Sequence, residues 1–173
     1  MRGPDGRGSS EDTRRRLFDA ARELFTDQGF DNVTVRDLCT RAGANLAAIN
    51  YHFGDKLALY LEVVRSAVEE MRSTNHEMMA GPELPAADRL RRYVREYVPR
   101  LMLIDRRRAW IQKLMRNEMS EPTAAAQLII EEILRPRVAY LTGIVAELVG
   151  CAPDDPRVTR CVSAIQMQCF ACI

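Results

Sequence analysis

The chain has 173 residues, of which 47% are hydrophobic, and this fraction is enough for a core and excludes disorder throughout. Its 25 Lys and Arg residues nearly balance 24 Asp and Glu residues, so the net charge of +1 excludes a global attraction to nucleic acid, and any such affinity must come from a local patch. The longest apolar segment, Val138 to Val149, is interrupted by Thr142, Gly143 and Glu147, which excludes a membrane span.

Residues 1–9 are expected to form a disordered tail, because they are mostly Gly, Pro, Arg and Ser and contain no apolar segment of the signal-peptide type. We therefore expect the protein to stay in the cytoplasm. Five cysteines in that reducing compartment do not predict a disulfide framework. Cys169 and Cys172 form a CxxC pair without a second pair or a nearby histidine, so we expect buried small hydrophobic residues rather than a metal site.

Apolar residues recur at spacings of three and four almost from end to end, whereas alternation with period two is nearly absent. The sequence therefore predicts an all-α fold. The first helix is expected to begin at Ser10 or Asp12 and to end at Gly29, since glycine takes the left-handed C-cap conformation without strain. Two short helices are then expected over 35–42 and 46–53. A long helix is expected to start at Asp55.

The rest of the chain predicts further helices separated by Pro and Gly. They are expected over 88–104 with a kink at Pro99, through Trp110 and Met115, from Glu121 to Val149 with a bend at Pro136, and from Arg157 to the end of the chain. We therefore expect two helical domains after the tail, over 10–55 and over 56–173.

The segment from Thr34 to Lys56 has the layout of a helix-turn-helix. Gly43 lets the two short helices cross closely, and three apolar residues are expected to hold the second helix in place: Leu38, Ile49 and Phe53. The opposite face of the second helix is small and polar, so that the helix can enter a major groove of DNA. The side chains of that face are Leu46, Ala47, Ala48, Asn50 and Tyr51.

Three stretches resemble the signature of TetR-type transcriptional regulators in order and spacing: Thr34-Val35-Arg36-Asp37-Leu38, Arg41-Ala42-Gly43-Ala44-Asn45, and Ile49-Asn50-Tyr51-His52-Phe53 with Lys56. The resemblance covers residues 11–60. The stretch from Asn45 to Gly54, with Trp110-Ile111-Gln112 and Arg116 to Thr123, further resembles the CecR-like branch. The resemblance implies an N-terminal three-helix DNA-binding module and a C-terminal helical domain that binds a ligand. The branch implies a response to toxic compounds or antibiotics through control of efflux genes.

Roles on DNA follow from this resemblance and from residue chemistry. Thr34, at a helix N-terminus, can hold a phosphate, while Arg36 matches guanine and Asn50 matches adenine. The family more often has an aromatic residue at position 50, which implies a different operator sequence. Tyr51 and His52 resemble the family's phosphate-contacting aromatic pair, to which Lys56 adds a cation. The expected DNA-binding residues are Thr34, Arg36, Asn45, Leu46, Ala47, Ala48, Asn50, Tyr51, His52 and Lys56.

Each assignment has an ordinary structural alternative. His52 could instead be a solvated or core histidine and Tyr51 a half-buried surface ring, although the neighbouring signature residues favour phosphate contact. Arg14, Arg15 and Arg16 form a charge run whose ordinary interpretation is a solvated face, although at the start of the first helix they would lie near a phosphate backbone.

Downstream of Leu57 the sequence contains no HExxH, GxSxG or phosphate-binding loop, so we expect neither an enzyme nor a cofactor. Four carboxylates, those of Glu118, Glu121, Glu131 and Glu132, lack histidine at matching spacing, so no metal site is expected. Soft apolar side chains gather in this part of the chain, most of them expected in the core and a few around an effector cavity. The expected ligand-binding residues are Tyr97, Met102, Trp110, Leu114, Met115, Met119, Tyr140 and Ile144.

Together these observations predict a repressor that a small apolar or amphipathic effector releases from a palindromic double-stranded DNA operator. The alternative is an all-helical ligand-binding or protein-interaction module without specific DNA binding, and an enzyme is the weakest hypothesis. A homodimer through the last two long helices is implied by the family, but only one such helix follows Pro156. Its apolar face continues to Ile173, so we expect a truncated chain that exposes Ile165, Cys169 and Phe170 and dimerises weakly. A short natural variant whose last helix docks on its own domain is the alternative.

Overall fold

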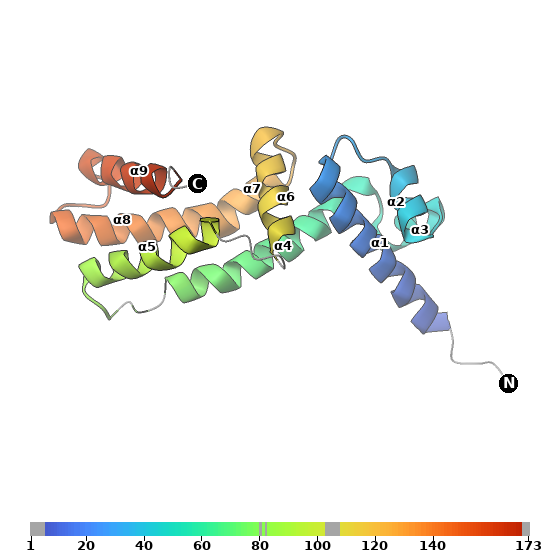
Figure 1. Ribbon diagram of the computed structural model, residues 1–173, viewed down its shortest axis with the longest axis horizontal. Helices are drawn as coiled ribbons and strands as arrows, with labels where there is room; N and C mark the ends of the chain where they lie inside the picture. Colours follow the sequence, from blue (N-terminus) through green and yellow to red (C-terminus); the bar gives the residue numbers. More distant parts are fainter. Residues whose placement is uncertain (1–5, 80, 82, 103–107, 171–173) are drawn as a thin grey trace. The chain divides into compact units, whose positions relative to one another are not determined.

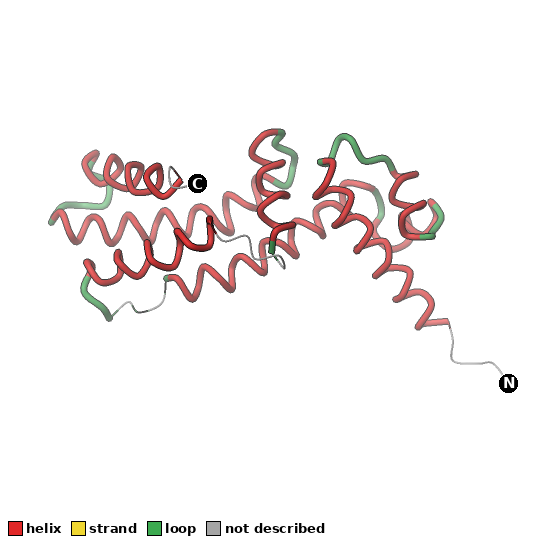
Figure 2. The backbone as a smooth tube through the Cα atoms, in the orientation of Figure 1, coloured by secondary structure: helices red, strands yellow, loops and turns green. Residues whose placement is uncertain are grey.

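The computed structural model describes residues 6–79, 81, 83–102 and 108–170, with backbone alone at 6–9, 100–102 and 170. The described residues form helices and loops and contain no strand, which confirms the all-α prediction (Figures 1 and 2). The helical elements are α1 (Gly6–Gln28), α2 (Val35–Ala42), α3 (Leu46–Phe53), α4 (Lys56–Met78), α5 (Ala86–Met102), α6 (Ala109–Ser120), α7 (Ala126–Ile129), the π-helical turn η1 (Ile130–Leu134), α8 (Arg135–Val149) and α9 (Pro156–Phe170). None of the helices in these ranges is long and apolar enough to cross a membrane.

Helix boundaries differ from the expected ones mainly at the helix N-termini. Residues 6–9 of the expected tail belong to α1, since a helix that has nucleated extends at little cost, and residues 1–5 lie outside the described part. Residues 103–104 of the helix expected over 88–104 and residues 171–173 of the last expected helix also lie outside the described part. The start of α4 is capped as expected, because the Ala58 amide donates to Asp55 Oδ1 at 2.7 Å.

The helix expected to run from Glu121 begins only at Ala126 and contains a π-helical turn. Thr123 Oγ1 accepts a hydrogen bond from the Ala125 amide at 3.0 Å, so a side chain satisfies a backbone donor ahead of α7. Pro136 has no N–H to donate to the carbonyl four residues earlier, and the preceding Arg135 amide donates instead to the Ile130 carbonyl. The irregularity expected at Pro136 therefore takes the form of η1.

The chain divides into two compact units whose boundary differs from the expected one at residue 55. The first unit contains residues 1–67 and 107–126, and the second contains residues 68–106 and 127–173. Helix α6, which we expected in the C-terminal domain, thus belongs with α1, α2 and α3. Its side chains explain this placement, because Asn117 Nδ2 donates to the Phe25 and Thr26 carbonyls at 3.3 and 3.1 Å, and Lys113 pairs with Asp27 at 2.7 Å.

The core of the first unit is built around three aromatic rings and one buried carboxylate. Phe25, Phe30 and Tyr60 pack with ring centroids 4.9 to 5.9 Å apart. The Tyr60 hydroxyl donates to Glu118, which also accepts from the Thr123 amide at 3.2 Å and hydroxyl at 2.9 Å. Burial, then the hydrogen bond to Glu118, raise the pKa of Tyr60, so its hydroxyl stays a donor. Glu118 therefore joins α4, α6 and the loop that follows α6.

The second unit buries the faces of α5, α8 and α9 in a common core that also includes Met78 and Tyr93. Val158, Val162 and Cys169 are buried in this core, and Ile165 is partly buried against it. The expectation that α9 exposes Ile165 and Cys169 is therefore wrong, because α5 and α8 of the same unit cover that face. The side chain of Phe170 lies outside the described part.

The Glu118 network generates the first prediction. Replacing Tyr60 by Phe removes one hydrogen bond to a buried carboxylate, which should lower the free energy of unfolding by about 2 kcal/mol. Urea unfolding followed by circular dichroism measures this change. Tyr51→Phe is the matched control, since that ring is 80% exposed and its loss should change stability by less than about 0.5 kcal/mol. Equal stability of the Tyr60 variant and the wild type would contradict the role of this bond.

Candidate nucleic-acid interface

Helix α2 begins with a capping box. The Thr34 hydroxyl accepts from the Asp37 amide at 3.2 Å, and the Asp37 carboxylate accepts from the Thr34 amide at 2.9 Å and from its hydroxyl at 2.6 Å. These bonds, first from the hydroxyl and then from the amide, lower the pKa of Asp37 below its ordinary value of 3.8. The contribution of the box to stability is thus complete above that value and is lost as the pH falls through the lowered pKa. Since the Thr34 hydroxyl already has two partners, its contact with a phosphate stays a prediction.

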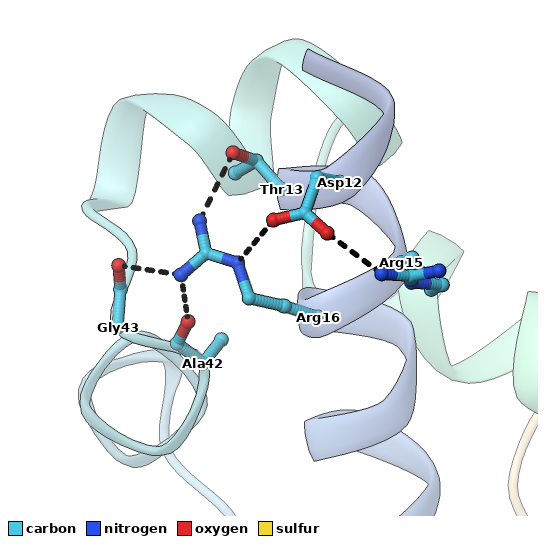
Figure 3. A network of polar contacts seen from close by, with 6 residues as sticks. All are labelled: Asp12, Thr13, Arg15, Arg16, Ala42 and Gly43. Carbon is cyan, nitrogen blue, oxygen red and sulfur yellow. Dashed lines mark hydrogen bonds and ion pairs between the residues drawn. The ribbon is translucent and has the colours of Figure 1, made fainter. Parts of the chain in front are cut away.

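The turn between α2 and α3 depends on Gly43 and on an arginine from α1. Gly43 has φ +60°, the left-handed conformation that glycine adopts without strain, and caps α2. Arg16 Nη1 donates to the carbonyl oxygens of Ala42 at 2.9 Å and of Gly43 at 3.3 Å (Figure 3). The same guanidinium contacts Asp12 at 3.2 Å and Thr13 at 3.2 Å. A Cβ atom at position 43 would lie 3.3 Å from Arg16 Nη1, so a larger residue there would strain the backbone and displace the arginine by a few tenths of an ångström.

The arginine run of α1 is therefore not a uniform solvated face. Arg14 pairs with Glu62 at 2.6 Å, with its guanidinium carbon 5.1 Å from the Phe53 ring centroid, and Arg15 pairs with Asp12 at 2.7 Å. The guanidinium groups of Arg14 and Arg16 thus join α1 to other helices of the unit. The sequence run alone does not predict these partners, which lie 26 to 48 residues away.

Helix α3 has one buried face and one exposed face. Asn45 caps it, with Oδ1 accepting from the Ala48 amide at 2.9 Å, and Ile49 is fully buried. The side chains of Leu46 and Tyr51 are 57% and 80% exposed. Ala47 and Asn50 are exposed beside them. Because Ala47 and Ala48 are small, Asn50 and Tyr51 are the longer polar side chains that this face presents to solvent.

The remaining expected DNA-binding residues lie at the end of α3, on α2 and at the start of α4. The rings of Tyr51 and His52 meet edge to face at 4.9 Å, and His52 is half-buried. Lys56, the first residue of α4, places Nζ 4.2 Å from the Phe30 ring centroid. Arg36 is exposed on α2. All ten expected residues belong to the first unit, and their contacts with DNA stay predictions.

The expected ligand-binding residues do not form one group within either unit. Tyr97, Tyr140 and Ile144 belong to the second unit, whereas four others lie on α6 in the first: Trp110, Leu114, Met115 and Met119. Leu114 is fully buried, Met119 is 77% exposed, and the Trp110 ring lies 5.6 Å from the Arg22 guanidinium. The side chain of Met102 lies outside the described part. Hydrophobicity alone therefore did not distinguish the cores of the two units, and ligand binding stays a prediction.

A surface groove of about 500 Å³ in the second unit has none of the expected ligand-binding residues in its wall. It is lined by Ala87, Leu90, Arg91, Val94, Arg95 and Leu148. Among the residues that the structure describes, no group of three or more His, Cys, Asp and Glu side chains is placed to hold a metal ion.

The contacts of Arg16 generate the second prediction. Replacing Arg16 by Ala should lower the free energy of unfolding by about 1 kcal/mol and weaken binding to every DNA sequence alike, because the turn loses its hydrogen bonds. The dependence of log K on log salt concentration, measured by fluorescence anisotropy, should keep its slope. A slope smaller by about one would instead show that Arg16 contacts a phosphate. Arg15→Ala is the matched control for stability, since that side chain is 73% exposed and pairs with Asp12 one turn earlier.

Comparisons with known proteins agree with this geometry. A family model described as bacterial regulatory proteins of the TetR family matches residues 17–63, and one described as the C-terminal domain of the HTH-type transcriptional dual regulator CecR matches residues 86–173. The CecR regulator of Shigella flexneri is 31% identical over 157 residues, which are 85% of this chain and 69% of that protein. The HTH-type transcriptional repressor Rv1474c of Mycobacterium tuberculosis is 41% identical over 79 residues, 40% of this chain and 42% of the repressor.

A solved structure shows the same fold. The crystal structure of a mutant HlyIIR protein matches with a TM-score of 0.53 at 19% identity, over 80% of this chain and 74% of that one. The helix-turn-helix geometry, the match of the C-terminal family model to half of the chain and the identity to the Shigella regulator lead to one conclusion. The chain belongs to the TetR family of transcriptional regulators, in the CecR-like branch.

Proposed function

We propose that this protein is a transcriptional repressor that binds a palindromic DNA operator as a homodimer and is released by a small apolar or amphipathic effector. The observation that carries the DNA-binding part is the exposed face of α3, where Asn50 and Tyr51 stand beside Ala47 while Ile49 is buried. A helix of this kind enters the major groove and reads base edges through its longest polar side chains.

Support for repression comes from the family. The TetR family is mostly one of repressors, and the relative in Mycobacterium tuberculosis carries that description. An effector that binds better to the conformation with the wrong separation of recognition helices lowers DNA affinity by its differential binding energy. In a dimer this separation affects DNA affinity, because the two recognition helices bind two half-sites at the same time.

Selection of bound sequences from a random duplex pool tests the proposal. Enrichment of a palindrome with half-sites about one or two helical turns apart supports a dimeric regulator. An unenriched pool, with gel shifts equally weak on every duplex, would instead favour a ligand-binding or protein-interaction module without specific DNA binding. Enrichment of a single half-site would reject the dimer while keeping specific recognition.

The position of Lys56 at the start of α4 generates the third prediction. Lys56→Ala should weaken binding to all duplexes by a similar factor and lower the salt slope by about one, because one phosphate contact is lost. The matched control is Lys113→Ala, the only other lysine of the chain, whose ammonium pairs with Asp27. Anisotropy titrations at several salt concentrations measure both. Selective loss on the preferred duplex alone would contradict a phosphate contact.

Asn50 generates the fourth prediction, which concerns sequence preference. Asn50→Ala should cost about 1 to 3 kcal/mol on the preferred site and relax the preference at one base position. Asn45→Ala should behave differently, since losing the α3 cap lowers stability by about 1 kcal/mol and weakens binding without changing the preference. Competition titrations with single-base variants of the selected site separate the two. Equal losses on selected and random duplexes for Asn50→Ala would reject base reading by Asn50.

A further inference from the structure

The second unit contains a buried arginine without a carboxylate partner. Arg137, on α8, is 8% exposed, and Nη1 donates to the Tyr97 hydroxyl at 2.8 Å while Nη2 donates to Asn75 Oδ1 at 3.3 Å. Its guanidinium carbon lies 4.7 Å from the Tyr97 ring centroid. Its Nε has no hydrogen-bond partner. Among the described residues of this unit, Arg137 is the one buried charged side chain and no ion pair neutralises it.

Two tyrosine hydroxyls of the same unit are also buried without partners, those of Tyr93 and Tyr140. The Tyr93 ring centroid lies 5.3 Å from that of Tyr97 and 6.3 Å from that of Tyr140, so the three rings are neighbours. Burial raises the pKa of Tyr93 although the Arg137 charge opposes this, so the hydroxyl keeps its proton near neutral pH. We name Asn75, Tyr93, Tyr97, Arg137 and Tyr140 the Arg137 cluster. It contains three donors, one N–H and two O–H, that lack acceptors.

The π-helical turn helps to fix this cluster. η1 ends directly before α8, and Asn75 Nδ2 donates to the Ile133 carbonyl in that turn at 3.5 Å. Asn75 thus links the irregular backbone to Arg137 through its two side-chain atoms. Single π-helical turns within α-helices are common at functional sites, where they redirect side chains.

Unpaired buried donors and an unneutralised buried charge are both costly, so their concentration at one place needs an explanation. We propose that the Arg137 cluster binds the carboxylate of an organic monoanion. A single negative charge matches the single buried positive charge, whereas a phosphate dianion would leave one negative charge without compensation. A planar carboxylate accepts up to four hydrogen bonds and is the natural partner of a guanidinium edge and two hydroxyls.

Identifying this carboxylate as the head group of the effector rests on the proposed function. The surrounding core is apolar, with Leu141 and Val145 of α8 next to the tyrosines. An amphipathic carboxylic acid therefore fits the cluster better than an uncharged apolar compound. Binding of the carboxylate itself does not depend on DNA and is measured without it.

A purely structural role for the cluster predicts different behaviour of its variants. Tyr93→Phe removes a hydroxyl that has no partner, so the free protein should be as stable as the wild type or more stable. Arg137→Met removes the buried charge at similar volume but also leaves the buried Asn75 Oδ1 without its donor, so its stability is measured beside its affinity. A ligand site predicts that both variants lose carboxylate affinity, and that Tyr93→Phe does so without a loss of stability.

Calorimetric titration of the full chain tests the site with two matched series of probes. The first series is hexanoate, octanoate, decanoate and dodecanoate, and the second is the four corresponding alcohols. At least one alkanoate should bind more tightly than its alcohol, and Arg137→Met should abolish that preference. Tyr93→Phe should weaken the alkanoate by about tenfold, the value of one hydrogen bond to a charged group, without lowering the thermal midpoint of the free protein.

Arg135→Met is the matched control, since Arg135 is exposed on the same helix and its replacement removes the same charge. It should keep wild-type affinity for the alkanoate. Three results would each overturn the site: no alkanoate that binds more tightly than its alcohol, equal losses in Arg135→Met and Arg137→Met, or unchanged affinity in Tyr93→Phe. Should Arg137→Met fail to fold, Tyr93→Phe and Tyr140→Phe decide the question with the same probes.

A second titration separates this site from the proposed function. The selected operator is bound first, and the tightest alkanoate is then added in gel-shift experiments. Release from DNA in the wild type but not in Tyr93→Phe supports both the site and its effector role. Alkanoate binding through the cluster with unchanged DNA affinity keeps the site and rejects the effector role. Specific DNA binding without alkanoate binding keeps the regulator and overturns the site.

Discussion

The hydrogen bonds from Arg16 to the carbonyl oxygens of Ala42 and Gly43 are the interaction on which the presentation of α3 depends. Two helices of eight residues each are too short to be stable alone, so their crossing must be fixed by other parts of the unit. Caps at Thr34 and Asn45 satisfy the first amides, Gly43 turns the chain, and Arg16 holds the turn against α1. Leu38 and Ile49 then bury the inner faces, which leaves the outer face of α3 to solvent.

Helix α6 extends this polar attachment to a part of the chain almost one hundred residues away. Asn117 donates to carbonyl oxygens in the last turn of α1, where a helix leaves its acceptors unsatisfied, and Lys113 pairs with Asp27 there. Glu118 joins the same helix to Tyr60 of α4. These hydrogen bonds connect α1 and α4 to α6, a segment outside the helix-turn-helix.

The two units treat their buried charges in opposite ways. Glu118 accepts hydrogen bonds from two hydroxyls and one amide, so its burial is compensated within the protein. Arg137 has a cation–π contact and two hydrogen bonds, but neither a counter-charge nor a partner for Nε. The first arrangement is what a structural carboxylate requires, whereas the second leaves binding capacity unused within the match to the CecR C-terminal domain.

The sequence by itself determined the features that depend on local chemistry. Helical periodicity predicted the all-α class. The helix caps at Thr34, Asn45 and Asp55 and the turn at Gly43 also follow from the sequence, because caps and turns need partners only a few residues away. Only the tertiary structure decided where long side chains end. It assigned Arg16 to the turn, α6 to the first unit, and Trp110 and Tyr97 to separate units. The physical reason is that the hydrophobicity and charge of a residue decide whether it must be buried or paired. Packing among residues far apart in the chain decides which partner it takes.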